Sequence, residues 1–278
     1  MSMDSIQVDP CPHLPVERGP DGKGVGAWVV QDKYRYLHQY LRAARAAMAR
    51  WPERIYIDPF CATGRVQVRG EDFTRPGGAV EAWRALAGTP GQFTRMLVGD
   101  LEESRAAACS ERLMRLGAPA TAFAGPAVET VPRMVAEVPR NALCIAFLDP
   151  YNFELLDFGM LRTLAQRKVD LIVHFSTMDV LRNADMELDP VRRRFGAAAP
   201  GWRDQPWAAT CNKASLPVAV EGFWQSLVRG LGFEHSAARP LITNDRGKGI
   251  YKLAFFARHK LPIRLWGDIA KDRNGALF

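Results

Sequence analysis

The stretch that decides the fold is Arg54-Ile-Tyr-Ile-Asp58-Pro-Phe-Cys-Ala-Thr-Gly64. Its first half is a short β-rich run, and its second half is a loop of small residues that begins at an acid. Similar short apolar runs follow at 96–100, 121–124, 143–149 and 171–176. Strands that are buried on both faces have this pattern, so we expect these runs to form a sheet.

Helical patterns alternate with these strands. They span roughly 78–87, 102–116, 128–138 and 158–166, and a longer helix from about 27 to 50 carries apolar residues at spacings of three and four. Alternating strands and helices indicate an α/β fold with a parallel sheet. Strands at 239–243 and 250–258 flank the turn-rich residues 244–249, which predicts an antiparallel hairpin. We therefore expect a Rossmann-like, mostly parallel seven-stranded sheet with a C-terminal antiparallel hairpin at one edge.

The remaining segments differ in composition. Residues 1–26 hold four prolines and four glycines with no apolar period, which predicts an irregular N-terminal arm before a single domain over 27–278. Residues 177–215 interrupt the alternation of strands and helices and include the run Arg192-Arg193-Arg194. An excursion of this length in a compact domain is usually functional. We expect it to overhang the carboxyl ends of the strands as a lid for a substrate or partner.

Composition excludes several classes of protein. With 278 residues, 47% apolar and 24% charged, the chain has the make-up of a folded domain. Its runs without charged or polar residues, such as 142–148, are far shorter than the roughly 20 residues of a membrane-spanning helix. No apolar signal segment begins the chain, so a cytoplasmic location is expected. The five cysteines form no CxxC pair and the histidines lack ligand spacing, which predicts neither disulfides nor a metal site.

Three acids close strands of the predicted sheet. They are Asp58, Asp100 in Val98-Gly-Asp100-Leu101, and Asp149 in Asp149-Pro-Tyr-Asn152. Ligands of open α/β sheets bind beyond the carboxyl ends of the strands, and an acid at the second strand can accept both hydroxyls of a ribose. The chain has no GxGxxG and no GxxxxGKS, which argues against a dinucleotide or P-loop site. Two structural alternatives stay open: Asp149 turns the chain, or Asp100 caps the next helix.

In order and register, these motifs resemble the adenosylmethionine site of class I methyltransferases. Residues 149–152 are similar to the fourth motif of the amino-methyltransferases. More specifically, the chain resembles the three-Cys-motif partner proteins, a bacterial family with a methyltransferase-like fold that is named for a radical-SAM-like protein with three cysteines. The resemblance rests on Trp28, Lys33, Tyr36-Leu37 and Tyr40, Tyr56 to Phe60 with Gly64 and Arg65, Gly77-Gly78, Phe147 to Tyr151, Met186 to Trp202 with Phe195-Gly196, Tyr251 to Phe256, His259, Trp266 and Ile269. Where that family tends to have Ala-Gly-Pro-Gly, this chain has Cys61-Ala62-Thr63-Gly64.

The resemblance implies a methyltransferase that uses S-adenosylmethionine, with N-methylation of a nucleic-acid base as the expected reaction. The expected cofactor-binding residues are Asp58, Pro59, Phe60, Cys61, Gly64, Asp100 and Leu101. The expected catalytic residues are Asp149, Pro150, Tyr151 and Asn152. There, Asp149 and the carbonyl of Pro150 would accept hydrogen bonds from an amine while Tyr151 stacks on its ring.

The charge of the chain is compatible with an RNA or DNA partner. Its net charge is +7 and its pI is near 9.3, and lysine and arginine contacts to phosphate supply most non-specific affinity for nucleic acid. The expected phosphate contacts are Lys33, Arg35, Arg42, Arg65, Arg192, Arg193 and Arg194. Two alternatives remain: a non-catalytic binding protein for the three-Cys-motif protein, and a methyltransferase for a small molecule or peptide.

Overall fold

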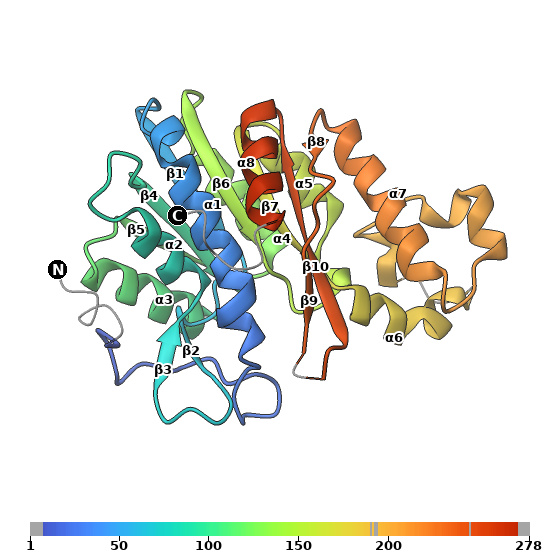
Figure 1. The fold of residues 1–278 in the computed structure, drawn as a ribbon, viewed down its shortest axis with the longest axis horizontal. Coiled ribbons are helices and arrows are strands. Elements are labelled where there is room, and N and C mark those ends of the chain that lie inside the picture. The colour runs from blue at the N-terminus through green and yellow to red at the C-terminus, as the bar shows by residue number, and fades with distance from the viewer. Residues whose placement is uncertain (1–7, 190, 192–193, 245, 272–278) are drawn as a thin grey trace.

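A single mixed sheet forms the centre of the molecule (Figure 1). The computed structural model describes residues 8–189, 191, 194–244 and 246–271. The strand order is β5-β4-β1-β6-β7-β10-β8, and β9 pairs with β10 beside this path. β1, β4, β5, β6 and β7 are parallel, and β10 is antiparallel to β7. The expected Rossmann-like, mostly parallel fold is thereby confirmed. The strands are β1 Glu53–Asp58, β4 Arg95–Asp100, β5 Ala120–Ala124, β6 Ala142–Leu148, β7 Lys168–Phe175, β8 Glu234–His235, β9 Leu241–Thr243 and β10 Gly249–Ala257.

The C-terminal strands differ in detail from the expected hairpin. β9 and β10 do pair antiparallel, with Lys252 opposite Leu241. However, β10 lies inside the sheet, because its other end pairs with β8 through Phe256 and His235. The edge of the sheet is therefore shared by β8 and β9. A strand of two residues, such as β8, leaves no pattern in a sequence.

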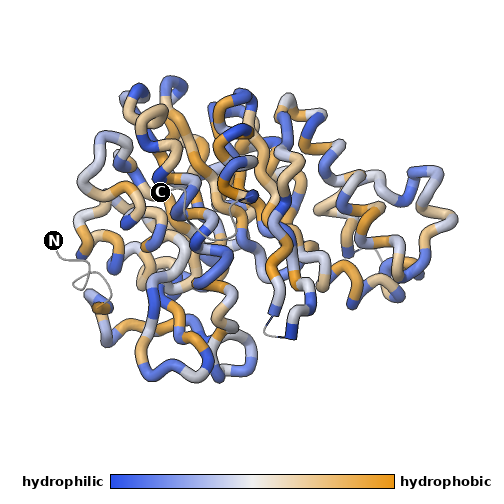
Figure 2. Tube along the Cα trace, viewed as in Figure 1, coloured by the Kyte–Doolittle hydropathy of each residue, from blue (hydrophilic) through white to orange (hydrophobic). Residues whose placement is uncertain are grey.

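Helices cover both faces of the sheet. Neighbouring residues of β1 enter opposite cores, because side chains alternate along a strand: Tyr56 packs with α1, α2, α3 and α8, whereas Ile55 and Ile57 pack with α4, α5, α6 and α7. Figure 2 shows this apolar centre, with hydrophilic residues in the outer loops. The helices are α1 Arg35–Met48, α2 Gly78–Leu86, α3 Glu103–Arg115, α4 Ala127–Ala136, α5 Phe158–Leu164, α6 Thr177–Leu188, α7 Leu216–Gly230 and α8 Lys260–Lys271. None of the helices in the described ranges is long and apolar enough to cross a membrane.

The first helix does not begin as an ordinary α-helix. A π-helix, Val29–Tyr34, precedes α1, so the expected single helix over 27–50 has two parts. Lys33 and Tyr34 are both buried in this turn. π-helical turns are rare and occur often at functional sites.

The N-terminal arm, rather than the 177–215 segment, lies at the ends of β1 and β4. The described arm residues, 8–26, are irregular as expected, and they meet β2 Arg65–Gln67, which pairs with β3 Thr74–Pro76. Glu17 and Val25 form bridges to this hairpin. The 177–215 segment contains α6 and three short 3-10 helices, and in Figure 1 α6 and α7 extend beside the sheet beyond β10. Residues of this segment contact the chain that follows β6, through Asp179 to Phe153 and Arg194 to Glu154. The expected overhang and the role of the segment as a lid remain predictions.

Candidate functional site

The candidate site lies where the strand order reverses. β1 pairs with β4 on one side and with β6 on the other, and ligands of open α/β sheets bind at such a switch point. Asp58 ends β1, Asp100 ends β4, and Asp149 follows β6. The fold thus brings the three predicted acids to one edge of the sheet.

Asp58 is a buried acid without an ion-pair partner among the described residues. It is 1% exposed and accepts hydrogen bonds from the backbone N–H of Phe60 at 3.1 Å and the hydroxyl of Tyr56 at 3.2 Å. Burial raises the pKa of Asp58 to about 8, and the nearby charge of Asp149 acts in the same direction. A positive group placed beside Asp58 would favour its ionised form.

The loop after Asp58 is tightly packed. Ala62 has φ of +49°, the one positive value at a non-glycine position in the described ranges, and Gly64 has φ of +73°. A Cβ added at Gly64 would lie 3.1 Å from Cys109 of α3, so no larger residue fits without rearrangement. Cys61 is buried here, and its backbone N–H donates to the carbonyl of Gly99. Phe60 is partly buried against the core.

Asp100 connects this loop to α3. Its Oδ2 accepts from the backbone N–H of Ala62 at 3.1 Å, and its Oδ1 accepts from that of Glu102 at 3.1 Å. Arg105 also approaches Asp100, at 3.5 Å, and pairs with Glu17 of the arm. Glu102, the N-cap residue of α3, makes no side-chain cap hydrogen bond, and Asp100 accepts a hydrogen bond from its backbone N–H, so the helix-cap alternative for Asp100 stays open. Leu101, beside it, is 70% exposed.

Asp149 is held by charge rather than by turn geometry. Its Oδ2 lies 2.5 Å from Nζ of Lys33, and its Oδ1 lies 2.7 Å from Nδ1 of His174. Although burial opposes ionisation, Lys33 and then His174 hold the pKa of Asp149 well below its usual range. The pairing of Leu148 with Val173 places Asp149 and His174 side by side on β6 and β7. Asp149 is therefore a paired carboxylate and not only a turn residue.

Two polar atoms in this cluster have no hydrogen-bond partner among the residues that the structure describes. They are Nε2 of His174 and the hydroxyl of Tyr251, both buried, and the two rings lie 3.8 Å apart between centroids. An unsatisfied buried polar group costs about 1–3 kcal/mol. Two such groups beside a paired carboxylate indicate a site that a ligand completes.

The other predicted residues of the 149–152 motif have separate positions. Pro150 is buried, whereas Tyr151 is 74% exposed beside it. The side chain of Asn152 accepts from the backbone N–H of Leu155 and caps a short 3-10 helix, Phe153–Leu155. Tyr151 is thus accessible for stacking, while Asn152 has a structural contact.

Three of the predicted phosphate contacts are corrected by the structure. Lys33 is 6% exposed and paired with Asp149, and Arg65 is 3% exposed and donates to the side-chain and backbone oxygens of Thr74. Arg194 pairs with Glu154 at 2.7 Å. Lys33 and Arg65 are thus enclosed within the protein, and Arg194, which is partly exposed, is paired with a carboxylate. Arg42 is exposed on α1 as expected. Arg192 and Arg193 lie outside the described residues.

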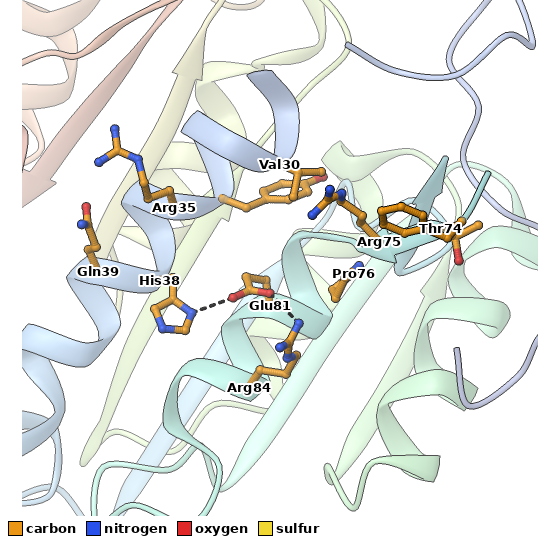
Figure 3. A pocket seen from close by; sticks show the side chains of 11 residues that line it. Val30, Arg35, His38, Gln39, Thr74, Arg75, Pro76, Glu81 and Arg84 are labelled. Carbon is orange, nitrogen blue, oxygen red and sulfur yellow. Dashed lines mark hydrogen bonds and ion pairs between the residues drawn. The ribbon is translucent and has the colours of Figure 1, made fainter. Parts of the chain in front are cut away.

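Arg35 lines a separate pocket of about 280 Å³ between α1, β3 and α2 (Figure 3). In that pocket Glu81 pairs with both His38, at 2.6 Å, and Arg84, at 3.3 Å. Arg75 pairs with Glu71 at 2.7 Å. The lining therefore holds three arginines and one carboxylate, and Glu71 and Asp32 approach Arg75 and Arg35 from outside the lining. Its lining residues are Val30, Tyr34, Arg35, His38, Gln39, Phe73, Thr74, Arg75, Pro76, Glu81 and Arg84.

His174 and Tyr251 are site residues to which the sequence assigns no role, although Tyr251 begins one of the stretches that carry the family resemblance. Spacing excludes His174 from a metal site and assigns it no other role. The one signal available is its place at the end of the strand that follows the strand of Asp149. Applying the strand-end rule to every predicted strand would have found it.

Comparisons with known proteins give a distant likeness to methyltransferase structures. No family model matches the sequence, and no curated protein matches it. The chain is similar to a putative O-methyltransferase from Klebsiella pneumoniae, with 13% identity and a TM-score of 0.45 over 91% of this chain and 88% of that chain. It is also similar to the O-methyltransferase TomG from Streptomyces achromogenes, solved in complex with SAM, with 18% identity and a TM-score of 0.44 over 81% and 78% of the two chains. An O-methyltransferase from Bacillus cereus, in complex with SAH, matches with 10% identity and a TM-score of 0.42 over 79% of each chain. The likeness is too distant to carry a functional argument, which rests on the site itself.

Proposed function

We propose that the protein is a methyltransferase that uses S-adenosylmethionine. The observation that carries the proposal is Asp58, a buried acid with a pKa raised to about 8, at the switch point of a Rossmann-like sheet. S-adenosylmethionine bears a positive amino group and a positive sulfonium, which is the charge that an uncompensated buried acid favours. The residues at this edge therefore fit the charge of this cofactor.

The neighbouring residues fit its other parts. Asp100 keeps lone pairs for ribose hydroxyls, because each of its oxygens accepts one backbone hydrogen bond. Gly64 lets the backbone turn sharply beside the site, and Pro59, Phe60, Cys61 and Leu101 frame the same edge. When bound, the cofactor supplies an activated methyl group, so the protein mainly aligns the acceptor.

The acceptor side is the Asp149 cluster, and we propose a nucleic-acid base as the methyl acceptor. Tyr151 is exposed beside Asp149 and can stack on a ring, while Arg35 and Arg42 lie partly or fully exposed on the first helix. The net charge of +7 favours a polyanion. The carbonyl of Pro150 and Asp149 would hold the polar edge of the base.

A second candidate is a binding protein for a three-Cys-motif radical-SAM-like protein. The favouring observation is the closed loop: Gly64 packs against Cys109, and the backbone N–H of Ala62 occupies one oxygen of Asp100. A loop packed in this way also suits a non-catalytic protein whose surface binds a partner.

Calorimetric titration with S-adenosylmethionine and S-adenosylhomocysteine separates the two candidates. We expect the wild-type protein to bind both ligands, and Asp58→Asn and Asp100→Asn each to weaken binding of S-adenosylmethionine at least about tenfold, or about 1.4 kcal/mol. Asp72→Asn, at an exposed acid, is the matched control and should bind as the wild type does. If the wild-type protein binds neither ligand, the enzyme proposal is rejected, and the second candidate is tested by direct mixing with a three-Cys-motif protein.

A further inference from the structure

The hydrogen-bond partners of His174 determine where its proton lies. Nδ1 is 2.7 Å from Asp149, whose carboxylate stays ionised beside Lys33 and can only accept hydrogen bonds. Nδ1 must therefore carry a proton. Burial lowers the pKa of the imidazole, which keeps the ring neutral near neutral pH. In a neutral ring with Nδ1 protonated, Nε2 carries a free lone pair.

Nε2 is the free base of this cluster. It is buried and has no hydrogen-bond partner in the described part of the chain. Each oxygen of Asp149 already accepts one hydrogen bond: Oδ2 from Nζ of Lys33 at 2.5 Å, and Oδ1 from Nδ1 of His174 at 2.7 Å. The remaining polar group, the hydroxyl of Tyr251, is also unpartnered, and its ring packs on that of His174. A group that entered the cluster would meet Nε2, an acceptor without a partner among the described residues, beside one hydroxyl.

We propose that Nε2 of His174 accepts the proton of the methyl acceptor, and that the acceptor group is a weakly acidic O–H or ring N–H. The inference rests on the proposed methyl transfer. The acceptor atom forms a bond to the methyl carbon, the carbon–sulfur bond breaks with its electron pair kept by sulfur, and the proton of the acceptor passes to Nε2. The imidazolium then loses this proton to solvent.

The neighbours of His174 suit this role. Asp149 orients the ring through Nδ1 and stabilises the imidazolium, as the carboxylate does in other carboxylate–histidine pairs. Lys33 and Asp179 are the further charged groups that affect His174, one opposing and one favouring its protonation. An exocyclic amine attacks with its own lone pair and needs no base beforehand, whereas a hydroxyl or ring N–H gains nucleophilicity when its proton is removed. The geometry therefore favours the second class of acceptor.

Nitrogen NMR of the full chain, labelled with ¹⁵N in its histidines, tests the tautomer without any acceptor. The variant His174→Asn identifies the signals of His174, because they are missing from its spectrum. The asparagine amide can still donate to Asp149, although the variant lacks Nε2. We expect His174 to be neutral near neutral pH, with the proton on Nδ1 and Nε2 bare. A proton on Nε2, or a doubly protonated ring at that pH, would overturn the proposal.

The ionisation of 4-nitrocatechol, followed by absorbance in the S-adenosylhomocysteine complex, tests the acceptor class. We expect the bound hydroxyl to ionise at least about one pH unit below the free probe in the wild type and in His259→Asn, an exposed control. In His174→Asn this shift should vanish while calorimetric binding of S-adenosylhomocysteine persists. An equal shift in His174→Asn, or a complex that neither binds nor ionises the probe, would overturn the inference. Failure to bind S-adenosylhomocysteine would instead reject the proposed function, and the NMR result would still decide the tautomer.

Discussion

Asp58 and Asp149 end neighbouring parallel strands and are both buried, yet their environments have opposite effects. The pKa of Asp58 is raised to about 8, whereas that of Asp149 is held well below its usual range. Asp58 meets a tyrosine hydroxyl and a backbone N–H, while Asp149 meets a lysine and a histidine. The sign of the shift therefore depends on the partners and not on burial alone.

This contrast divides the site into two parts. The β1–β4 side holds an acid that lacks a positive partner and suits a cationic cofactor. The β6–β7 side has a carboxylate that is already neutralised from within the chain, and its charge is used to orient His174. In the proposed function, this edge binds a cation at Asp58 and supplies a base at His174, because Lys33 forms its ion pair with only one of the two acids.

Removing Lys33 should abolish the difference in pKa between Asp58 and Asp149, and it should have the largest effect on the free energy of unfolding. We expect Lys33→Met to lower the free energy of unfolding by about 3–5 kcal/mol near neutral pH, because Asp149 is left as a buried carboxylate without its lysine. The pKa of Asp149 should rise toward that of Asp58. Urea denaturation measures the loss, and the double variant Lys33→Met, Asp149→Asn should recover most of it. A loss below about 1 kcal/mol would show that the pair contributes little.

Replacing Asp58 with a neutral residue should raise the free energy of unfolding rather than lower it. The folded pKa of about 8 exceeds the unfolded value near 3.9, so the folded state holds the extra proton and wild-type stability falls as pH rises from about 4 to 8. We expect Asp58→Asn to be more stable than the wild type by on the order of 2–3 kcal/mol at the upper end of this window and equal to it at the lower end. Urea denaturation across this pH range measures the difference, and parallel curves would contradict the assignment.

Asp170 provides a matched control for that variant. Burial raises its pKa to about 7, and the hydroxyl of Tyr40 donates to it at 2.7 Å. Asp170→Asn should flatten the pH dependence of stability in the same way, but it should leave binding of S-adenosylmethionine unchanged. If it weakens binding as Asp58→Asn does, the effect on binding is general and not due to the site.

The affinity for S-adenosylmethionine should depend on pH through Asp58. A cationic ligand favours the carboxylate, so binding releases a proton below about pH 8, and affinity should rise by up to about tenfold per pH unit, or 1.4 kcal/mol, as pH approaches 8. Calorimetry in buffers of different ionisation enthalpy measures the released proton. In Asp58→Asn the dependence should be flat, and a wild-type affinity that falls with rising pH would exclude this coupling.

The smallest expected effect concerns the loop beside Asp58. Ala62→Gly should raise stability by about 0.5–1 kcal/mol, because glycine adopts a positive φ without strain. Thermal unfolding measures it. Ala85→Gly, inside α2, is a control of opposite sign and should cost about 1 kcal/mol or more. A destabilised Ala62→Gly would mean that the methyl group contributes packing that outweighs the strain.

The positions of the three acids follow from the sequence, whereas their ionisation states do not. The carboxyl ends of parallel strands meet at one edge, so strand boundaries alone bring Asp58, Asp100 and Asp149 together. Lys33 lies on an amphipathic helix, where a lysine is usually exposed to solvent. No residue pattern predicts the π-helical turn that contains it. Its pairing with Asp149 joins residues 116 positions apart, beyond the reach of local patterns.

The contacts of the N-terminal arm are likewise not predictable from the local sequence. Its irregular backbone is predictable from proline and glycine, but the attachment of residues 9–15 depends on an arginine of α3. Arg112 is fully buried and donates to the carboxylate of Asp9 and to the backbone carbonyls of Cys11, Leu14, Pro15 and Thr63. An arginine in a helix is ordinarily exposed, so nothing in the local sequence predicts this contact.

That attachment sets an order of events during synthesis. Asp9 emerges from the ribosome 103 residues before Arg112, so this end of the arm lacks its arginine partner until α3 is complete, whereas Glu17 and Val25 can pair with the β2–β3 hairpin earlier. The carbonyl of Thr63, in the loop after β1, accepts a hydrogen bond from the same guanidinium and also lacks this partner until α3 is made. The β1 side of the site therefore matures late although its residues are made early, because chain closure over long separations is slow.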